Sequence, residues 1–274
     1  MPAQTRRTRR TALLSGLVAL SLGLALTGCA TYDAQSPRDA REHAYKAAGT
    51  TGSTAGEGHP AGRSAALPAG AVDCRTAKCI ALTFDAGPSA HTPALLKVLA
   101  DKKVRVTFFL LGHNHVDKYP DLVRQMAGNG NVLGNHSWTH PRLTDLEPAR
   151  IRAELDRLDD EVERLTGQRP TLMRPPQGRT DEKVSKVCKE LGLAQVLWSD
   201  TASDYATTDT ALITKRILKD ASRDGIILLH DLYDGTVPAV PGIIDALRAQ
   251  GYTFVTVPEL LAPAAPEPGR VYRP

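Results

Sequence analysis

The stretch Ile80–Asp85 (IALTFD) gives the clearest indication of the fold. It is a short apolar run that ends in the carboxylate of Asp85. Runs of this kind, bounded by turn residues such as Gly87 and Pro88, are typical of buried strands. Outward from this stretch, similar runs predict seven strands in all. They cover residues 80–84, 104–111, 131–134, 171–174, 194–199, 225–229 and 252–256.

Amphipathic segments separate these runs and predict helices. The clearest ends at Gly167, and its apolar residues recur at steps of four and three, at Ile151, Leu155, Leu158, Val162 and Leu165. Three further segments contain comparable apolar groups, within residues 95–99, 212–218 and 243–247. Strands that alternate with helices predict an α/β fold, here a single domain with about seven parallel strands.

Polar residues follow most of the predicted strands. They are Asp85, His136, His140, Arg174, Asp200, Asp204 and His230. Catalytic residues of parallel α/β folds collect at the carboxyl ends of the strands. The sequence therefore predicts a catalytic site along one rim of the domain.

Composition limits the classes of partner. The chain has 274 residues, of which 42% are hydrophobic, 23% charged and only 5% aromatic. Its 34 basic and 30 acidic residues give a net charge of +4, but residues 1–28 hold four arginines and no acid, so the remainder is neutral (34 − 4 = 30). Neither charge nor aromatic content supports nucleic-acid binding.

The first 28 residues have the pattern of an export signal. Arginines at positions 6–10 precede an apolar run from Ala12 to Leu26, and Leu26-Thr27-Gly28-Cys29 follows. This tetrapeptide is similar to a bacterial lipobox, so we expect a lipid on Cys29 and a lipoprotein on the outer face of the cytoplasmic membrane, in the cell envelope. A plain transmembrane anchor is the alternative, but it needs about 20 apolar residues.

The chain is expected to divide into four parts. They are a signal peptide (1–28), a flexible Ala/Gly/Ser-rich tether (29–71), the folded domain (72–262) and a Pro-rich tail (263–274). Export to an oxidising compartment favours a short disulfide between Cys74 and Cys79. Cys188 lies at helical spacing among apolar residues, so we expect a buried core thiol.

Five stretches together resemble the polysaccharide deacetylase family, also called the NodB homology domain or carbohydrate esterase family four. They are Thr83–Pro88, His136–Pro141, Arg174–Gly178, Asp200–Tyr205 and Leu228–His230. The resemblance covers about residues 72–262, and each stretch comes at a predicted strand end. It implies a distorted (β/α) barrel with fewer than eight strands.

The resemblance also implies a role for each polar residue. His136 and His140, four residues apart, match metal ligands, and a bound divalent ion lowers the pKa of water to roughly 7. Asp85 matches the general base, Arg174 the cation that pairs with it, and His230 the general acid. Asp200 or Asp204 is expected to support that histidine. The expected substrate contacts are Gln177, through its backbone N–H at the oxyanion, together with Leu228 and Tyr205.

The sequence departs from the family pattern at the first stretch. Ala86 occupies the position where the family usually has a second aspartate, the third protein ligand to the metal, and a methyl group cannot coordinate a cation. We therefore expect a divalent ion, Zn²⁺ by its ligands, at a weakened site. His113 and His115 are interpreted as residues of a surface loop.

Three functions compete for this constellation. The first is a hydrolase of carbon–nitrogen bonds other than peptide bonds, a metal-dependent deacetylase of N-acetylglucosamine in peptidoglycan or another envelope glycan. The second, suggested by Ala86, is a metal-poor, non-catalytic relative that binds a glycan. The third is an O-acetyl esterase acting on a polysaccharide with the same residues. A tethered monomer is expected in each case.

Overall fold

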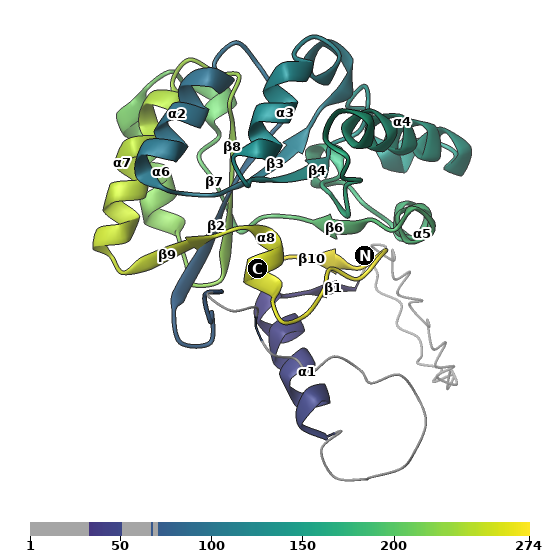
Figure 1. The fold of residues 1–274 in the computed structure, drawn as a ribbon, viewed down its shortest axis with the longest axis horizontal. Coiled ribbons are helices and arrows are strands. Elements are labelled where there is room, and N and C mark those ends of the chain that lie inside the picture. Colours follow the sequence, from purple (N-terminus) through teal and green to yellow (C-terminus); the bar gives the residue numbers. More distant parts are fainter. Residues whose placement is uncertain (1–32, 51–66, 68–70) are drawn as a thin grey trace, which may run out of the picture.

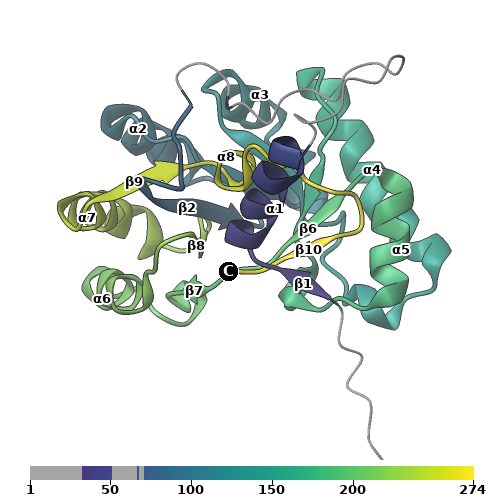
Figure 2. The same cartoon turned by 90° about the horizontal axis from the view of Figure 1, so that it is seen from below.

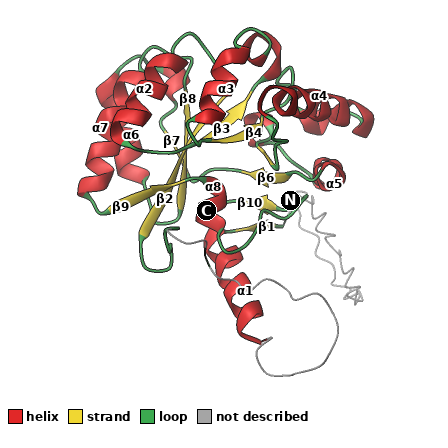
Figure 3. Ribbon diagram, in the orientation of Figure 1, coloured by secondary structure: helices red, strands yellow, loops and turns green. Residues whose placement is uncertain are grey.

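A single ten-stranded sheet, in which all strand pairs are parallel, organises the protein. The computed structural model describes residues 33–50, 67 and 71–274. The sheet curls into a half-barrel with helices around it (Figures 1 and 3). The order of the strands is β1-β10-β6-β5-β4-β3-β2-β8-β7, and β9 also pairs with β2. This is the α/β architecture that the sequence predicts.

Each of the seven predicted strands is present. They are β2 (Lys78–Asp85), β3 (Thr107–Leu110), β4 (Val132–Asn135), β5 (Leu172–Met173), β6 (Ala194–Val196), β8 (Gly225–His230) and β9 (Tyr252–Val255). The central strand β2 is buried along nearly its whole length, because a strand in a parallel sheet is covered by helices on its faces. Three strands of two residues each were not predicted: β1 (Ala34–Gln35), β7 (Asp200–Thr201) and β10 (Val271–Tyr272).

The helices form where apolar residues recur on one side of the helix, and capping residues mark the ends of several of them. They are α1 (Pro37–Thr50), α2 (Thr92–Lys102), α3 (Pro120–Gly128), α4 (Pro148–Thr166), α5 (Glu182–Leu191), α6 (Thr210–Asp220), α7 (Thr236–Ala249) and α8 (Val257–Leu261). The predicted stop of α4 is confirmed, because Gly167 adopts a left-handed conformation with φ 72°. Asp181 and Asp209 cap α5 and α6 by accepting backbone N–H hydrogen bonds.

Two segments that were expected to lie outside the domain are folded onto it. Part of the expected tether forms β1 and α1, and the expected tail contributes β10, which pairs with β1 on one side and β6 on the other. The buried Arg41 side chain holds α1 by an ion pair with Asp224 (3.0 Å) and a hydrogen bond to the Leu260 carbonyl (2.8 Å). Seen from below, α1 and α8 lie across the sheet (Figure 2).

The cysteines behave as expected where the structure describes them. Cys74 and Cys79 form a disulfide, and Cys188 is a free, fully buried thiol. The expected signal peptide and the lipidation site Cys29 lie outside the described residues. Within the described part of the chain, no helix has the length and apolar content to cross a membrane.

Candidate active site

The carboxyl ends of β2 and β8 bring Asp85 and His230 to the same point of the sheet. These two residues are register partners on adjacent strands. Arg174, which follows β5, is completely buried, and its Nη1 donates to Asp85 Oδ1 (2.6 Å) and to Thr83 Oγ1 (2.8 Å). The guanidinium also donates from Nε to the Val196 carbonyl (3.0 Å). Asp85 is thus fixed in one orientation.

His136 and His140 converge through their Nε2 atoms, which lie 3.2 Å apart. The His136 Nδ1 lies 2.7 Å from the carbonyl oxygen of Arg174. Because a carbonyl only accepts, Nδ1 carries the proton and Nε2 presents its lone pair to the site. Burial lowers the pKa of His136 to about 4 and also lowers the pKa of His140, so both rings are neutral near pH 7. Asp85 Oδ2 lies 3.9 Å from His136 Nε2.

Asp204, and not Asp200, supports His230. Asp204 Oδ1 lies 2.8 Å from His230 Nδ1, while Oδ2 accepts from the His230 backbone N–H (2.8 Å) and from Thr236 Oγ1 (2.8 Å). Burial opposes the charged ring, but the hydrogen bond and the charge of Asp204 outweigh it and raise the pKa of His230. Both Asp200 carboxylate oxygens are buried without a hydrogen-bond partner, and burial raises the pKa of Asp200 to about 7.

Two tyrosines stand beside His230. The ring of Tyr205 is 61% exposed and lies edge-on to the His230 ring at 6.3 Å between centroids. Tyr233, which the sequence did not single out, lies at 5.4 Å on a half-buried side chain. A hollow of about 570 Å³ opens beside them and includes Asp204, Thr207 and further residues. The rings of Tyr205 and Tyr233 thus offer apolar surface next to His230, at the edge of this hollow.

The other two expected substrate contacts differ in exposure. Leu228 is buried on β8. Gln177 is exposed and adopts a left-handed conformation (φ 59°) in the turn after Arg174, and Arg142 Nε lies 3.4 Å from its side-chain oxygen. Trp198 packs against Gly178 of the same turn. A small hollow of about 150 Å³ lies between this turn and Trp198.

The loop after Asp85 is held by a carboxylate that sequence reasoning missed. Asp231 directly follows His230, is fully buried, and accepts hydrogen bonds from Thr92 Oγ1 at Oδ2 and from Ser89 Oγ at its carbonyl. Its Oδ1 lies directly against Gly87, where a side chain would not fit. In the sequence, the position of Asp231 next to His230 was the feature that could have indicated a place near the site. His115 binds the same loop, with Nδ1 at 3.0 Å from the Pro88 carbonyl.

The donor set suits a divalent ion only in part. Two ligands at about 2.1 Å from a zinc ion, near the tetrahedral angle, are separated by roughly 3.4 Å, close to the 3.2 Å between the His136 and His140 nitrogens. The carbonyl that holds His136 Nδ1 is the kind of partner that metal-bound histidines have. Among the described residues, however, no three His, Cys, Asp or Glu side chains form a ligand group. The methyl side chain of Ala86, at φ 62°, supplies no lone pair.

Comparison with known proteins assigns the chain to a family. The model of the polysaccharide deacetylase family matches residues 73–196. Peptidoglycan-N-acetylglucosamine deacetylase PgdA of Listeria monocytogenes is 36% identical over 187 residues, covering 68% of this chain and 39% of that protein. A peptidoglycan-N-acetylglucosamine deacetylase of Bacillus cereus is 38% identical over 192 residues, covering 67% of this chain and 88% of that protein. The chain belongs to the polysaccharide deacetylase family, and it spans about two fifths of the length of the Listeria protein.

One of the similar solved structures is a variant of a pseudoenzyme. A mutant of a CE4 family pseudoenzyme with restored enzymatic activity is similar to this fold, with a TM-score of 0.65 and 27% identity. The similarity covers 68% of this chain and 68% of that one. The family therefore includes a member that is described as a pseudoenzyme.

Proposed function

We propose that the chain is a metal-dependent deacetylase that hydrolyses N-acetyl groups on a cell-envelope glycan, with peptidoglycan N-acetylglucosamine as the leading candidate. The observation that carries the proposal is the convergence of three pairs on one rim: Asp85 with Arg174, His136 with His140, and His230 with Asp204. The names of the Listeria and Bacillus relatives support the substrate class.

Each pair has a task in amide hydrolysis. Asp85, held by Arg174, is positioned to accept a proton from a water molecule near His136. His230 is positioned to donate a proton to the departing nitrogen, because the charge of Asp204 favours its protonated ring. His136 and His140 would hold the divalent ion, which supplies an activated water and stabilises negative charge when it is bound. Tyr205 and Tyr233 would orient the sugar beside His230.

The cellular location that we propose follows from the leader. Cleavage before Cys29 and attachment of lipid to this residue would keep the protein on the outer face of the cytoplasmic membrane. The disulfide between Cys74 and Cys79 supports export, because disulfides persist in oxidising compartments. A lipoprotein in this position faces the envelope glycan.

A second candidate function, glycan binding without catalysis, is favoured by Ala86. The experiment that separates the two compares the wild-type protein with Ala86→Asp and, as a matched control, Ala86→Asn. Bound zinc is measured by elemental analysis and titration calorimetry, and acetate release is measured from N-acetylglucosamine oligomers and peptidoglycan. Loss of a ligand weakens a site by more than the roughly 10–100-fold typical of residues behind the ligands, so we expect Ala86→Asp to bind zinc at least that much more tightly.

Zinc binding and acetate release by the wild-type protein support the deacetylase. If only Ala86→Asp binds zinc and turns over, the wild-type protein is a glycan-binding relative. If neither protein releases acetate while Ala86→Asp binds zinc, the deacetylase proposal is wrong. Asp85→Asn in the Ala86→Asp background should bind zinc but lose turnover, which tests the base separately.

A further inference from the structure

The chain enters the folded domain almost immediately after the predicted lipidation site. β1 begins at Ala34, which pairs with Val271 of β10, and the backbone N–H of Arg273 donates to the Gln35 carbonyl (3.0 Å). α1 follows at once and is held by the buried ion pair of Arg41. The segment between Cys29 and the fold is therefore five residues long at most, instead of the whole of residues 29–71.

This difference changes how far the domain can move from a membrane. Four residues of fully extended chain span at most about 14 Å, which limits the distance between Cys29 and Asp33. A flexible linker over residues 29–71 would instead have a root-mean-square reach of roughly 35 Å. A lipid on Cys29 thus brings the surface around Asp33 to the phospholipid headgroups.

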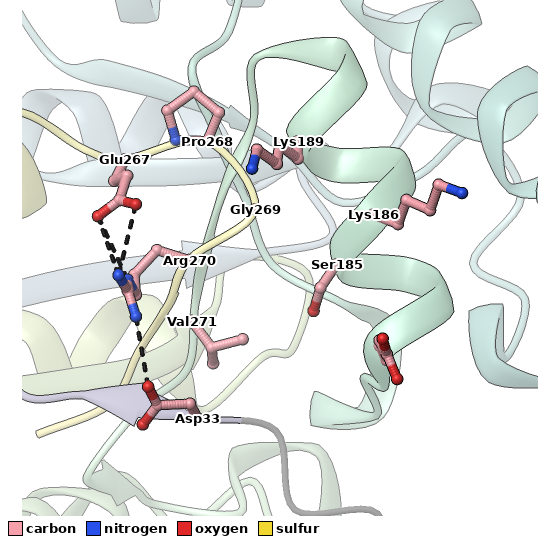
Figure 4. Close-up of a pocket in the computed structure, with 10 residues that line it drawn as sticks. Asp33, Ser185, Lys186, Lys189, Glu267, Pro268, Gly269, Arg270 and Val271 are labelled. Atoms are coloured by element: carbon pink, nitrogen blue, oxygen red, sulfur yellow. Dashed lines mark hydrogen bonds and ion pairs between the residues drawn. The ribbon is translucent and has the colours of Figure 1, made fainter.

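The surface around Asp33 is a shallow groove between α5 and the loop that enters β10 (Figure 4). Its volume is about 480 Å³. Arg270 crosses it and forms ion pairs with Glu267 (3.2 Å) and Asp33 (3.4 Å). Lys186 and Lys189 on α5 are exposed and form no ion pair within the described part of the chain. Glu182, on the same helix, is exposed and also lines the groove. We call Asp33, Lys186, Lys189, Glu267 and Arg270 the anchor face.

The anchor face lies away from the catalytic residues in the topology. Asp33 precedes β1, and the loop through Arg270 precedes β10, so both lie at the amino ends of parallel strands. Asp85 and His230 stand at the carboxyl ends of β2 and β8 in the same sheet. A membrane beneath the anchor face therefore leaves the catalytic rim open to a glycan.

We propose that the lipid on Cys29 seats the anchor face on the phospholipid headgroups, so that the domain stands on the membrane in one orientation. Lys186 and Lys189 are the free cations on this face, and they meet the phosphate groups of anionic lipids. The substrate is then a glycan held within about one domain diameter of the membrane. This inference rests on the lipidation included in the proposed function.

The test uses the lipidated full-length protein in vesicles of phosphatidylethanolamine and phosphatidylglycerol. Pro268→Cys, in the groove beside the anchor face, and, as a control, Asp121→Cys each add one exposed thiol for a fluorescent label. The native thiols do not interfere, because Cys74 and Cys79 are bonded and Cys188 is buried. Asp121 is in the first turn of α3, after the carboxyl end of β3. An acceptor dye on the lipid headgroups should quench the label at position 268 several-fold more than the label at position 121.

Two insertions test whether the short segment between Cys29 and β1 sets the orientation of the domain. About twelve Gly/Ser residues placed between Thr31 and Tyr32 add roughly 20 Å of reach and should abolish the difference in quenching. The same insertion after Gly58, which follows α1, should leave the difference intact. Equal quenching at positions 268 and 121, or a loss of the difference with the second insertion, would overturn the proposal.

Flotation of the vesicles tests the anchor separately. Cys29→Ser should remain in solution while the wild-type protein floats with the lipid. If the wild-type protein does not float, the lipid anchor and this orientation are both wrong. Acetate release by the same preparation still decides the chemistry of the proposed function independently.

Discussion

Asp204 binds His230 twice, through the ring Nδ1 and through the backbone N–H, both at 2.8 Å. The double contact fixes both the orientation of the ring and the position of the chain that carries it. Thr236, the first residue of α7, donates a third hydrogen bond to the same carboxylate (2.8 Å). The carboxylate therefore joins the end of β8 to the start of α7.

Replacing Asp204 by Asn should lower the pKa of His230. The wild-type pKa is raised, since the hydrogen bond and charge of Asp204 outweigh burial, and Asn removes the charge. His230 should therefore lose its proton at a lower pH in the variant than in the wild type. NMR titration of the His230 ring protons measures this shift, and the alkaline limb of the activity profile should move in the same direction. Asp200→Asn is the matched control, and an equal shift there would contradict the assignment.

Asp200→Asn should change the pH dependence of stability. Burial raises the pKa of Asp200 from its ordinary value of 3.8 to about 7. The folded protein therefore binds a proton between these values that the unfolded chain releases, so this carboxyl contributes stability at low pH that is lost as the pH rises through about 7. We therefore compare the free energy of unfolding of Asp200→Asn with that of the wild type at each pH. This difference should favour the variant by about 2 kcal/mol more at about pH 8 than at about pH 4.

Urea denaturation at the two pH values measures the effect of Asp200→Asn. Asp121→Asn, at an exposed surface position, should show no such difference between the two pH values. A pH-independent change in Asp200→Asn would mean that the buried carboxyl does not titrate in this range.

Ala86→Gly should stabilise the protein by about 0.5–1 kcal/mol. Ala86 has φ 62°, a left-handed conformation in which the Cβ atom of an L-residue is crowded and glycine is not. Thermal and urea denaturation of the metal-free protein measure the effect. Ala153→Gly is the control of opposite sign, because Ala153 is exposed in the middle of α4, where glycine costs about 0.5–1 kcal/mol. A loss in both variants would show that Ala86 is not strained.

Arg41→Ala should release α1 and destabilise the domain by about 3–5 kcal/mol, because the buried Asp224 loses its partner at 3.0 Å and keeps only Arg223 at 3.9 Å. Urea denaturation gives the free energy, and limited proteolysis within α1 reports the release. Arg38→Ala, on the exposed side of the same helix, should change neither measurement. If proteolysis of the two variants is indistinguishable, α1 is not held by the ion pair.

The sequence predicted the parts of the fold that depend on local pattern. The seven predicted strands follow from apolar runs such as Ile80–Phe84, and the end of α4 follows from Gly167. The two-residue strands β1 and β10 could not be predicted, because β1 pairs with a segment more than 200 residues away and β10 lies between that strand and the distant β6. α1 was missed for a related reason: its buried contact is an arginine, a residue type that usually stays exposed.

The site residues at the ends of strands could be predicted from the sequence. Those within loops were harder to predict. Asp85, His136, Arg174 and His230 follow strands that the pattern reveals. The choice between Asp200 and Asp204 depended on the course of the chain after β6, where Ser203 adopts a left-handed conformation before the turn at Asp204. No periodic signal in the sequence encodes that turn.

The placement of β10 between β1 and β6 has a mechanical consequence. A force applied through the amino-terminal segment would load the hydrogen bonds of β1 in shear, and β10 would pass the load into the central sheet. Removing the last four residues would remove β10. The attachment of β1 to the sheet therefore depends on the carboxyl-terminal end of the chain.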